Sequence, residues 1–122
     1  MPNYQVLFFE EEEGVSSSEN FVKSLAPKMS AKIFRLISMI SENGPQLREP
    51  YSKHLNDGIF ELRAQSGSDI SRVLYFFYIG KRVIITNGFI KKTQKTPQSE
   101  IDKAKAIRKE FIEREAKKDE NI

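Results

Sequence analysis

One short stretch of the chain gathers three lysines, namely Lys91, Lys92 and Lys95. It follows a predicted strand over 82–90 and precedes a predicted helix start at Thr96-Pro97, since threonine caps helices and proline suits the first helical turn. The surrounding segment 70–99 carries six Lys/Arg and no Asp or Glu. Protein surfaces normally mix both signs of charge, so this segment favours a partner that carries phosphate groups.

Two arginines are predicted to lie beside these lysines. Side chains alternate between faces along the predicted strand 58–65, so Glu61 and Arg63 share the face opposite the apolar residues. The next strand, 70–79, is apolar on both faces except for Arg72, as is typical of a central strand. The short hairpin brings Arg63 close to Arg72, and neighbouring cations destabilise a sheet unless an anion lies between them. That anion is either Glu61, as an ordinary cross-strand partner, or a bound phosphate.

Two aromatic residues, Tyr75 and Phe89, are predicted to border the same basic surface. Recognition of single-stranded RNA combines cations that hold phosphates with rings on which bases stack. We therefore expect Lys95, Tyr75 and Phe89 to bind RNA.

Several other kinds of chemistry lack the residues they need. The chain has no cysteine, which excludes disulfides, thiolate metal sites and a cysteine nucleophile. His54 is the sole histidine and has no Asp or Glu at a metal-ligand spacing, so we predict neither a metal nor a cofactor. The six glycines are dispersed, and neither a phosphate-cradling loop nor a nucleophile triad is present.

The chain is short enough to form one domain, 1–122, of the α+β class. Periodicity and capping signals predict the order β-α-α-β-β-β-α, with an antiparallel sheet packed on an N-terminal helix hairpin and a C-terminal helix. The predicted elements are strand 3–9, helices 17–25 and 27–43, loop 45–57, strands 58–65, 70–79 and 82–90, a helix from 97 to about 115, and a frayed tail over 117–122. The longest apolar run, 73–79, is too short to span a bilayer, so we expect a cytoplasmic protein.

Three separated motifs occur in an order that is similar to one known family. They are Leu55-Asn-Asp-Gly-Ile-Phe-Glu-Leu-Arg63, Arg72-Val-Leu-Tyr75, and Gly88-Phe-Ile-Lys-Lys-Thr-Gln-Lys-Thr-Pro97 with Glu100, Ile101 and Ala104. Over about residues 3–112 the chain resembles the HigB-like, phage-related branch of the RelE superfamily of bacterial toxins. The resemblance implies a microbial-ribonuclease-like fold, cleavage of messenger RNA on the translating ribosome, and neutralisation in a complex with a HigA-like helix-turn-helix antitoxin.

The resemblance also implies a set of site residues, which are Arg63, Arg72, Lys91, Lys92 and Lys95. Arginine suits a bidentate clamp on developing phosphate charge. Crowded cations favour loss of a proton from lysine, so Lys91 and Lys92 are expected as the base, unless the ribosome or the substrate supplies it. Some HigB proteins carry an Asp-Tyr-His run in the site, which this chain lacks.

Two alternatives of other classes stay open at this stage. The first is a toxin of the same fold that poisons gyrase by binding and catalyses nothing. The second is a plain binder of single-stranded nucleic acid. Fold alone does not decide between an enzyme and a binding protein.

Overall fold

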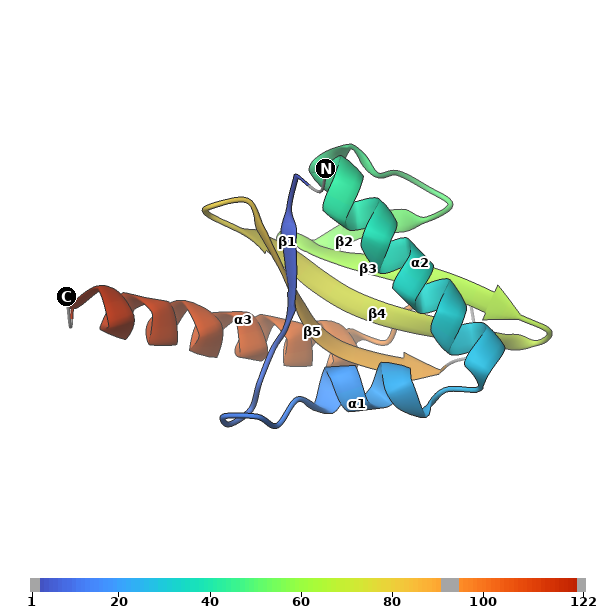
Figure 1. The fold of residues 1–122 in the computed structure, drawn as a ribbon, viewed down its shortest axis with the longest axis horizontal. Helices are drawn as coiled ribbons and strands as arrows, with labels where there is room; N and C mark the ends of the chain where they lie inside the picture. Colours follow the sequence, from blue (N-terminus) through green and yellow to red (C-terminus); the bar gives the residue numbers. More distant parts are fainter. Residues whose placement is uncertain (1–2, 91–94, 121–122) are drawn as a thin grey trace.

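A computed structural model describes residues 3–90 and 95–120, which form a five-stranded sheet with helices on both faces (Figure 1). The class is α+β, as the sequence predicts. The elements are β1 (Gln5–Phe8), α1 (Ser17–Ser24), α2 (Pro27–Asn43), a 3-10 turn (Gly44–Gln46), β2 (Ser52–Asn56), β3 (Ile59–Ser66), β4 (Asp69–Tyr78), β5 (Arg82–Ile90) and α3 (Gln98–Glu120).

The strand order in the sheet is β1-β5-β4-β3-β2, so β4 is the central strand, as its apolar sequence predicts. Strands β2 to β5 are joined antiparallel, whereas β1 pairs with β5 in parallel. The expected all-antiparallel sheet is therefore wrong at one edge. The chain leaves β1 through the two N-terminal helices and returns much later, which allows either strand direction.

Strand β2 lies where the sequence predicts only a loop. Ser52 pairs with Leu62 and His54 pairs with Phe60, so this segment extends the sheet outward from β3. Two prolines and scattered apolar residues, Leu47, Tyr51 and Leu55, predict a loop over 45–57. Pairing with a neighbouring strand outweighs weak intrinsic propensity at a sheet edge.

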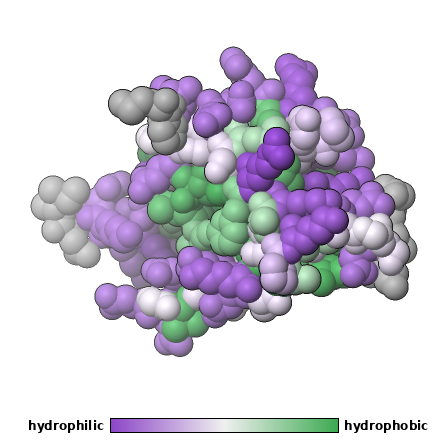
Figure 2. Space-filling model, turned by 45° about the vertical axis from the view of Figure 1, so that its right-hand side comes forward, coloured by the Kyte–Doolittle hydropathy of each residue, from purple (hydrophilic) through white to green (hydrophobic). Residues whose placement is uncertain are grey.

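Helices α1 and α2 cover one face of the sheet. The buried side chains of α2 recur at spacings of three and four residues, as predicted, and they are Met29, Ile33, Leu36 and Ile40. They pack in one cluster with Leu62, Val73 and Ile85 from the sheet and Val22 from α1. Figure 2 shows a hydrophobic patch near the centre of the face it draws, with hydrophilic side chains around it.

Helix α3 covers the opposite face, where Ala104 packs with Ile59, Leu74, Phe76 and Ile84. Its C-terminal half runs past the edge of the sheet, at the left of Figure 1. The helix continues to Glu120, so the expected end near Glu115 is wrong, while the fraying expected for 117–122 stays a prediction. Glu115 Oε1 lies 2.7 Å from Arg82 Nη1, and its Oε2 lies 2.9 Å from Lys118 Nζ, which anchors this part of the helix.

One glycine in β5 sets how closely α1 approaches the sheet. A Cβ atom at Gly88 would lie 2.5 Å from the ring of Phe21, which is closer than carbon atoms approach. The bare backbone at this position therefore lets α1 pack directly on β5. Within residues 3–90 and 95–120, no helix is both long enough and apolar enough to cross a membrane.

Candidate functional site: a charged pocket beside the start of α3

A group of charged side chains interrupts the apolar face that α3 covers. Arg63 and Arg72 are direct partners across β3 and β4, so the sheet places them side by side. Glu61 lies two residues before Arg63 on the same strand and therefore shares this face. The predicted neighbourhood of the three residues is confirmed.

Hydrogen bonds join these side chains to the start of α3. Arg63 Nη2 lies 3.3 Å from Glu61 Oε1. Thr96 donates its hydroxyl proton to Glu61 Oε2 and accepts a bond from Arg72 Nη1 at 3.4 Å. The Thr96 hydroxyl, expected as a helix cap, thus binds the sheet instead, while the Pro97 carbonyl accepts the first helical bond from the Glu100 N–H at 3.1 Å.

Burial divides this network into an inner part and an outer part. Glu61 and Arg72 are both 0% exposed, whereas the Arg63 side chain keeps 28% of its surface exposed. Burial lowers the pKa of Arg72. The negative charge of Glu61 raises this pKa in part, and the positive charge of Arg63 lowers it further. One carboxylate faces two guanidinium groups, so the network carries net positive charge. Arg72 has no surface available to a phosphate in this structure, which corrects the direct clamp expected for it.

The exposed part of the network opens into a pocket of about 180 Å³, lined by Glu49, Pro50, Lys53, Glu61 and Arg63. Lys53 lies directly opposite Glu61 in the β2–β3 pairing and so adds a cation to the same face. Glu49 contributes an exposed carboxylate. Lys53 and Glu49 are not among the site residues that the sequence predicts, because both lie in the segment predicted to be a loop. The pairing of β2 with β3 is what places Lys53 beside Glu61.

The three lysines of the sequence motif are placed unequally by the structure. Lys95 is exposed and directly precedes Thr96, whose hydroxyl is hydrogen bonded to Glu61. The expected catalytic residues Lys91 and Lys92 lie outside the described residues. Lys95 and Thr96 are thus the part of the motif that the structure describes, and the hydrogen bond of Thr96 to Glu61 places this part next to the pocket.

The two predicted aromatic residues lie on opposite faces of the sheet. Phe89 pairs with Arg72 and is half-buried on the face of the pocket. Tyr75 lies three residues after Arg72, packs in the core under α2 and is only 1% exposed. Its hydroxyl is hydrogen bonded to Ser52, and burial raises its pKa to about 12. Tyr75 cannot stack on a base, so its predicted role in RNA binding is wrong.

His54 is also turned away from the pocket. It pairs with Phe60 across β2 and β3, with ring centroids 4.9 Å apart, and its Nε2 accepts a hydrogen bond from the Gly58 N–H at 3.1 Å. In the described parts of the chain, His, Asp and Glu side chains form no group of three that would hold a metal ion. The groups around the pocket are thus two cations, two carboxylates and a proline.

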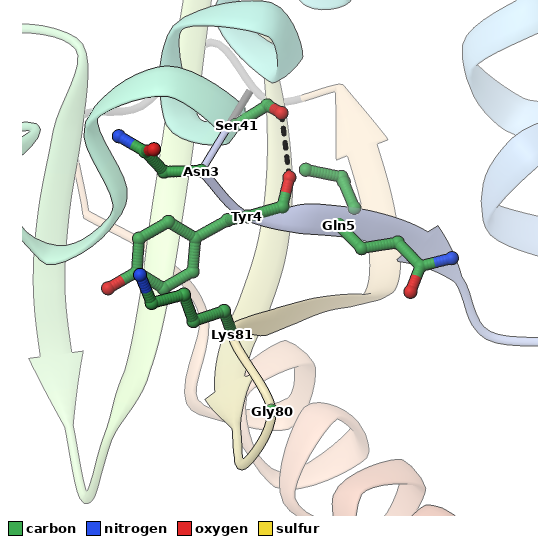
Figure 3. Close-up of a pocket in the computed structure, with 7 residues that line it drawn as sticks. Asn3, Tyr4, Gln5, Ser41, Gly80 and Lys81 are labelled. Atoms are coloured by element: carbon green, nitrogen blue, oxygen red, sulfur yellow. Dashed lines mark hydrogen bonds between the residues drawn. The ribbon is translucent and has the colours of Figure 1, made fainter. Parts of the chain in front are cut away.

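A larger pocket, of about 650 Å³, lies at the start of β1 and the turn between β4 and β5 (Figure 3). Ser41 donates a hydrogen bond to the Tyr4 carbonyl oxygen at 2.7 Å along its wall. Lys81 is the one charged residue among its lining residues, which also include Asn3, Gln5 and Gly80. This pocket has fewer groups for chemistry than the smaller one at Arg63.

Comparisons with known proteins place the chain in a family. The crystal structure of the archaeal RelE-RelB complex from Pyrococcus horikoshii OT3 contains a chain with a similar fold, with a TM-score of 0.50 and 17% sequence identity. The match covers 75% of this chain and 98% of that chain. A comparison with curated proteins found no match. The family model described as phage derived protein Gp49-like matches residues 20–109, so the chain belongs to the Gp49-like family of phage-derived proteins.

Proposed function

We propose that this protein is the toxin of a type II toxin-antitoxin system and that it cleaves messenger RNA on the translating ribosome. The observation that carries the proposal is the pocket at Arg63, where Lys53 and Arg63 line one cavity beside the buried Glu61 and Arg72. The RelE-like fold and the Gp49-like family support it. A toxin with this target acts in the cytoplasm.

The proposed reaction needs no metal ion. The 2′-hydroxyl of a ribose attacks the adjacent phosphorus and the bond to the 5′-oxygen breaks, which leaves a 2′,3′-cyclic phosphate and a 5′-hydroxyl. The attacking hydroxyl loses one proton, and the leaving oxygen gains one. Negative charge grows on the phosphate in the transition state, and a guanidinium group is suited to stabilise it. We assign this role to Arg63, with Lys53 and Lys95 holding neighbouring phosphates.

The carboxylate of Glu49 is our choice for the base that takes the 2′-proton. It is exposed and lines the pocket with Lys53 and Arg63, whereas the carboxylate of Glu61 is buried and bonded to Thr96. General bases must reach the proton that they remove, which an exposed pocket carboxylate is able to do.

The leaving oxygen also needs a proton donor, and His54 is not available for this role because it faces the other side of the sheet, while Lys53 is assigned to a phosphate. We propose that Lys91, Lys92 or a group of the ribosome supplies it. Arg72 and Thr96 then act as positioning residues, since they hold Glu61 and the start of α3 in place without contacting the substrate. An incomplete set of acid-base groups would restrict cleavage to RNA that the ribosome has already oriented.

A cognate antitoxin with a helix-turn-helix domain is the proposed partner. The hydrophobic patch in Figure 2 supports a surface that binds protein, since exposed apolar patches rimmed by polar residues mark interaction sites. The core under α1 and α2 leaves partly buried hydrophobic side chains at its margin, among them Val6, Phe8 and Phe21. We propose that an antitoxin helix covers this face and prevents entry to the ribosome.

The test is expression without the antitoxin, followed by primer extension on a translated transcript. New 5′ ends within codons are expected with the wild-type protein, and they should disappear when the start codon of that transcript is removed. A Glu49→Gln variant should fold normally, as judged by circular dichroism, and should give no new ends.

Three results would contradict the proposal in different ways. Equal cleavage of naked RNA would argue against dependence on the ribosome. Growth arrest with intact messenger RNA and altered DNA supercoiling would indicate a gyrase poison. Affinity for single-stranded RNA without cleavage in any condition would indicate a plain binding protein.

A further inference from the structure

We propose that a second pocket, on the other side of Arg63, binds one nucleotide of the same single-stranded RNA, with its base stacked on Tyr51 and its phosphate held by Arg35. This inference rests on the proposed function, because it extends the path of the RNA beyond the pocket at Glu49 and Lys53. We call the first the Glu49 pocket and the second the Tyr51 pocket.

The Tyr51 pocket has the chemical composition that a nucleotide requires. It measures about 390 Å³ and lies between α2 and the C-terminal half of β3. Its lining residues include Lys32, Arg35, Arg63, Tyr51, Leu36 and Met39, and none of the lining residues is acidic. Tyr51 is 45% exposed, unlike the buried Tyr75, so its ring is available for stacking. Cations beside an exposed ring bind single strands with little preference for sequence.

The two pockets share one residue. Arg63 lines both of them. It directly follows Leu62 on β3, and β3 has no β2 partner beyond Leu62, so Arg63 lies where the edge of the sheet becomes open. The last β2 partner on β3 is Leu62, which pairs with Ser52. An RNA strand with one phosphate at Arg63 in the Glu49 pocket therefore has its neighbouring nucleotide next to Tyr51.

An added protein strand fits this edge less well than RNA does. Beyond Leu62, two outward backbone groups of β3 already have partners within the chain. The Gln65 carbonyl accepts a hydrogen bond from Lys32 Nζ at 2.6 Å, and the Arg63 N–H donates to the Tyr51 carbonyl at 3.4 Å. A lysine on an open edge is a common device against strand addition. The side chains that remain available are Arg35 and the Tyr51 ring.

The absence of tryptophan from the chain makes Tyr51→Trp a unique fluorescent probe of this pocket. The titrant is a tetranucleotide of uridine with 2′-O-methyl groups, which binds but cannot be cleaved. We expect it to quench the tryptophan, and the same strand with one base removed at the stacked position to quench much less. In the wild-type background, Tyr51→Ala should weaken binding about 5- to 150-fold, while Tyr51→Phe should bind normally.

Charge is tested with Arg35→Ala and with Lys28→Ala as the matched control. Lys28 is an exposed cation on the same helix that does not line the pocket. Arg35→Ala should lower the slope of log affinity against log salt by about one unit, and Lys28→Ala should leave it unchanged.

The outcomes separate this inference from the proposed function. Cleavage of translated messenger RNA without quenching, or with equal quenching by the abasic strand, would overturn the Tyr51 pocket alone. Quenching that depends on Arg35 in a protein that never cleaves RNA would support the pocket and refute the proposed reaction. Quenching by the antitoxin but not by RNA would overturn the inference and make the pocket a protein-binding surface.

Discussion

The two faces of the sheet bury different kinds of side chain at adjacent positions of the same two strands. Leu62 pairs with Val73 beneath α2, and both are 0% exposed. The next pair along the strands, Arg63 with Arg72, lies on the opposite face beside the start of α3. A step of one residue therefore separates an apolar core from a charged network.

This difference separates an apolar pair, which stabilises the fold, from a charged pair within the otherwise apolar face under α3. Apolar pairs such as Leu62 and Val73 stabilise the fold through burial. Buried charges cost free energy for desolvation, and well-packed hydrophobic residues of similar volume often replace them without loss of stability. We propose that Arg63 is retained for contact with a phosphate, and that the buried Arg72 positions Glu61 and Thr96.

Arg63→Met should give the largest effect, because it removes the cation that we assign to the transition state. We expect cleavage of translated messenger RNA to fall about 10²- to 10³-fold. The measurement is the rate of cleavage in a translation reaction with purified components. Lys109→Met, which removes an exposed cation on α3, is the matched control and should keep full activity. Comparable activity of the two variants would remove Arg63 from the site.

Leu62→Ala should differ from Arg63→Met in both properties, with a large loss of stability and little loss of cleavage activity. Truncation of a buried leucine costs about 2 to 5 kcal/mol in the free energy of unfolding. Urea denaturation measures this cost, and cleavage is then assayed below the melting transition. A folded Leu62→Ala protein without activity would show that the two faces are not separable.

Tyr75→Phe should remove a dependence of stability on alkaline pH. The folded pKa of Tyr75 is about 12, above its ordinary value of 10.0, so the unfolded chain ionises first as the pH rises. Stability is therefore lost between pH 10 and 12, by about 2 to 3 kcal/mol for two pKa units. Denaturation at pH 9 and pH 12 should show a loss that is larger in the wild type than in the variant by about this amount. Equal losses in both would place the effect on other groups.

Gly88→Ala should destabilise the contact between α1 and β5. Its Cβ atom would meet the ring of Phe21, and overpacking of this kind costs about 1 to 3 kcal/mol. The double variant Gly88→Ala with Phe21→Leu should recover part of the loss, since the smaller side chain leaves room. A single variant as stable as the wild type would mean that α1 shifts freely on the sheet.

Lys95→Ala should give the smallest effect, on RNA affinity. Lys95 is exposed beside Thr96, so its loss should lower the slope of log affinity against log salt by about one unit while leaving stability unchanged. Filter binding over a range of salt concentrations measures the slope. A loss of cleavage as large as that of Arg63→Met would place Lys95 among the catalytic groups instead.

Local patterns were sufficient to predict the helices, the central strand and the Arg63–Arg72 neighbourhood. Alternation along β3 and a short turn to β4 fix which side chains meet. The same alternation places Tyr75 on the other face, because it lies three positions after Arg72 and an odd spacing puts two residues on opposite faces.

The missed features depend on contacts between distant segments. Strand β2 is polar and follows a proline, so only its pairing with β3 reveals that Lys53 lies opposite Glu61. The parallel pairing of β1 with β5 likewise joins the first and the last strand in the chain, which are far apart in the sequence. The role of Thr96 as the bridge between Glu61 and Arg72 requires the position of α3, which no local pattern specifies.

The most direct test of the separation between the two faces compares Arg63→Met with Leu62→Ala in one experiment. Each purified protein is melted by circular dichroism and then added to a translation reaction in which new 5′ ends on a defined messenger RNA are mapped and counted. We expect Arg63→Met to melt near the wild type and to cleave about 10²- to 10³-fold more slowly, whereas Leu62→Ala should melt much earlier and still cleave within codons at low temperature. Cleavage by a folded Arg63→Met protein at the wild-type rate would contradict this expectation.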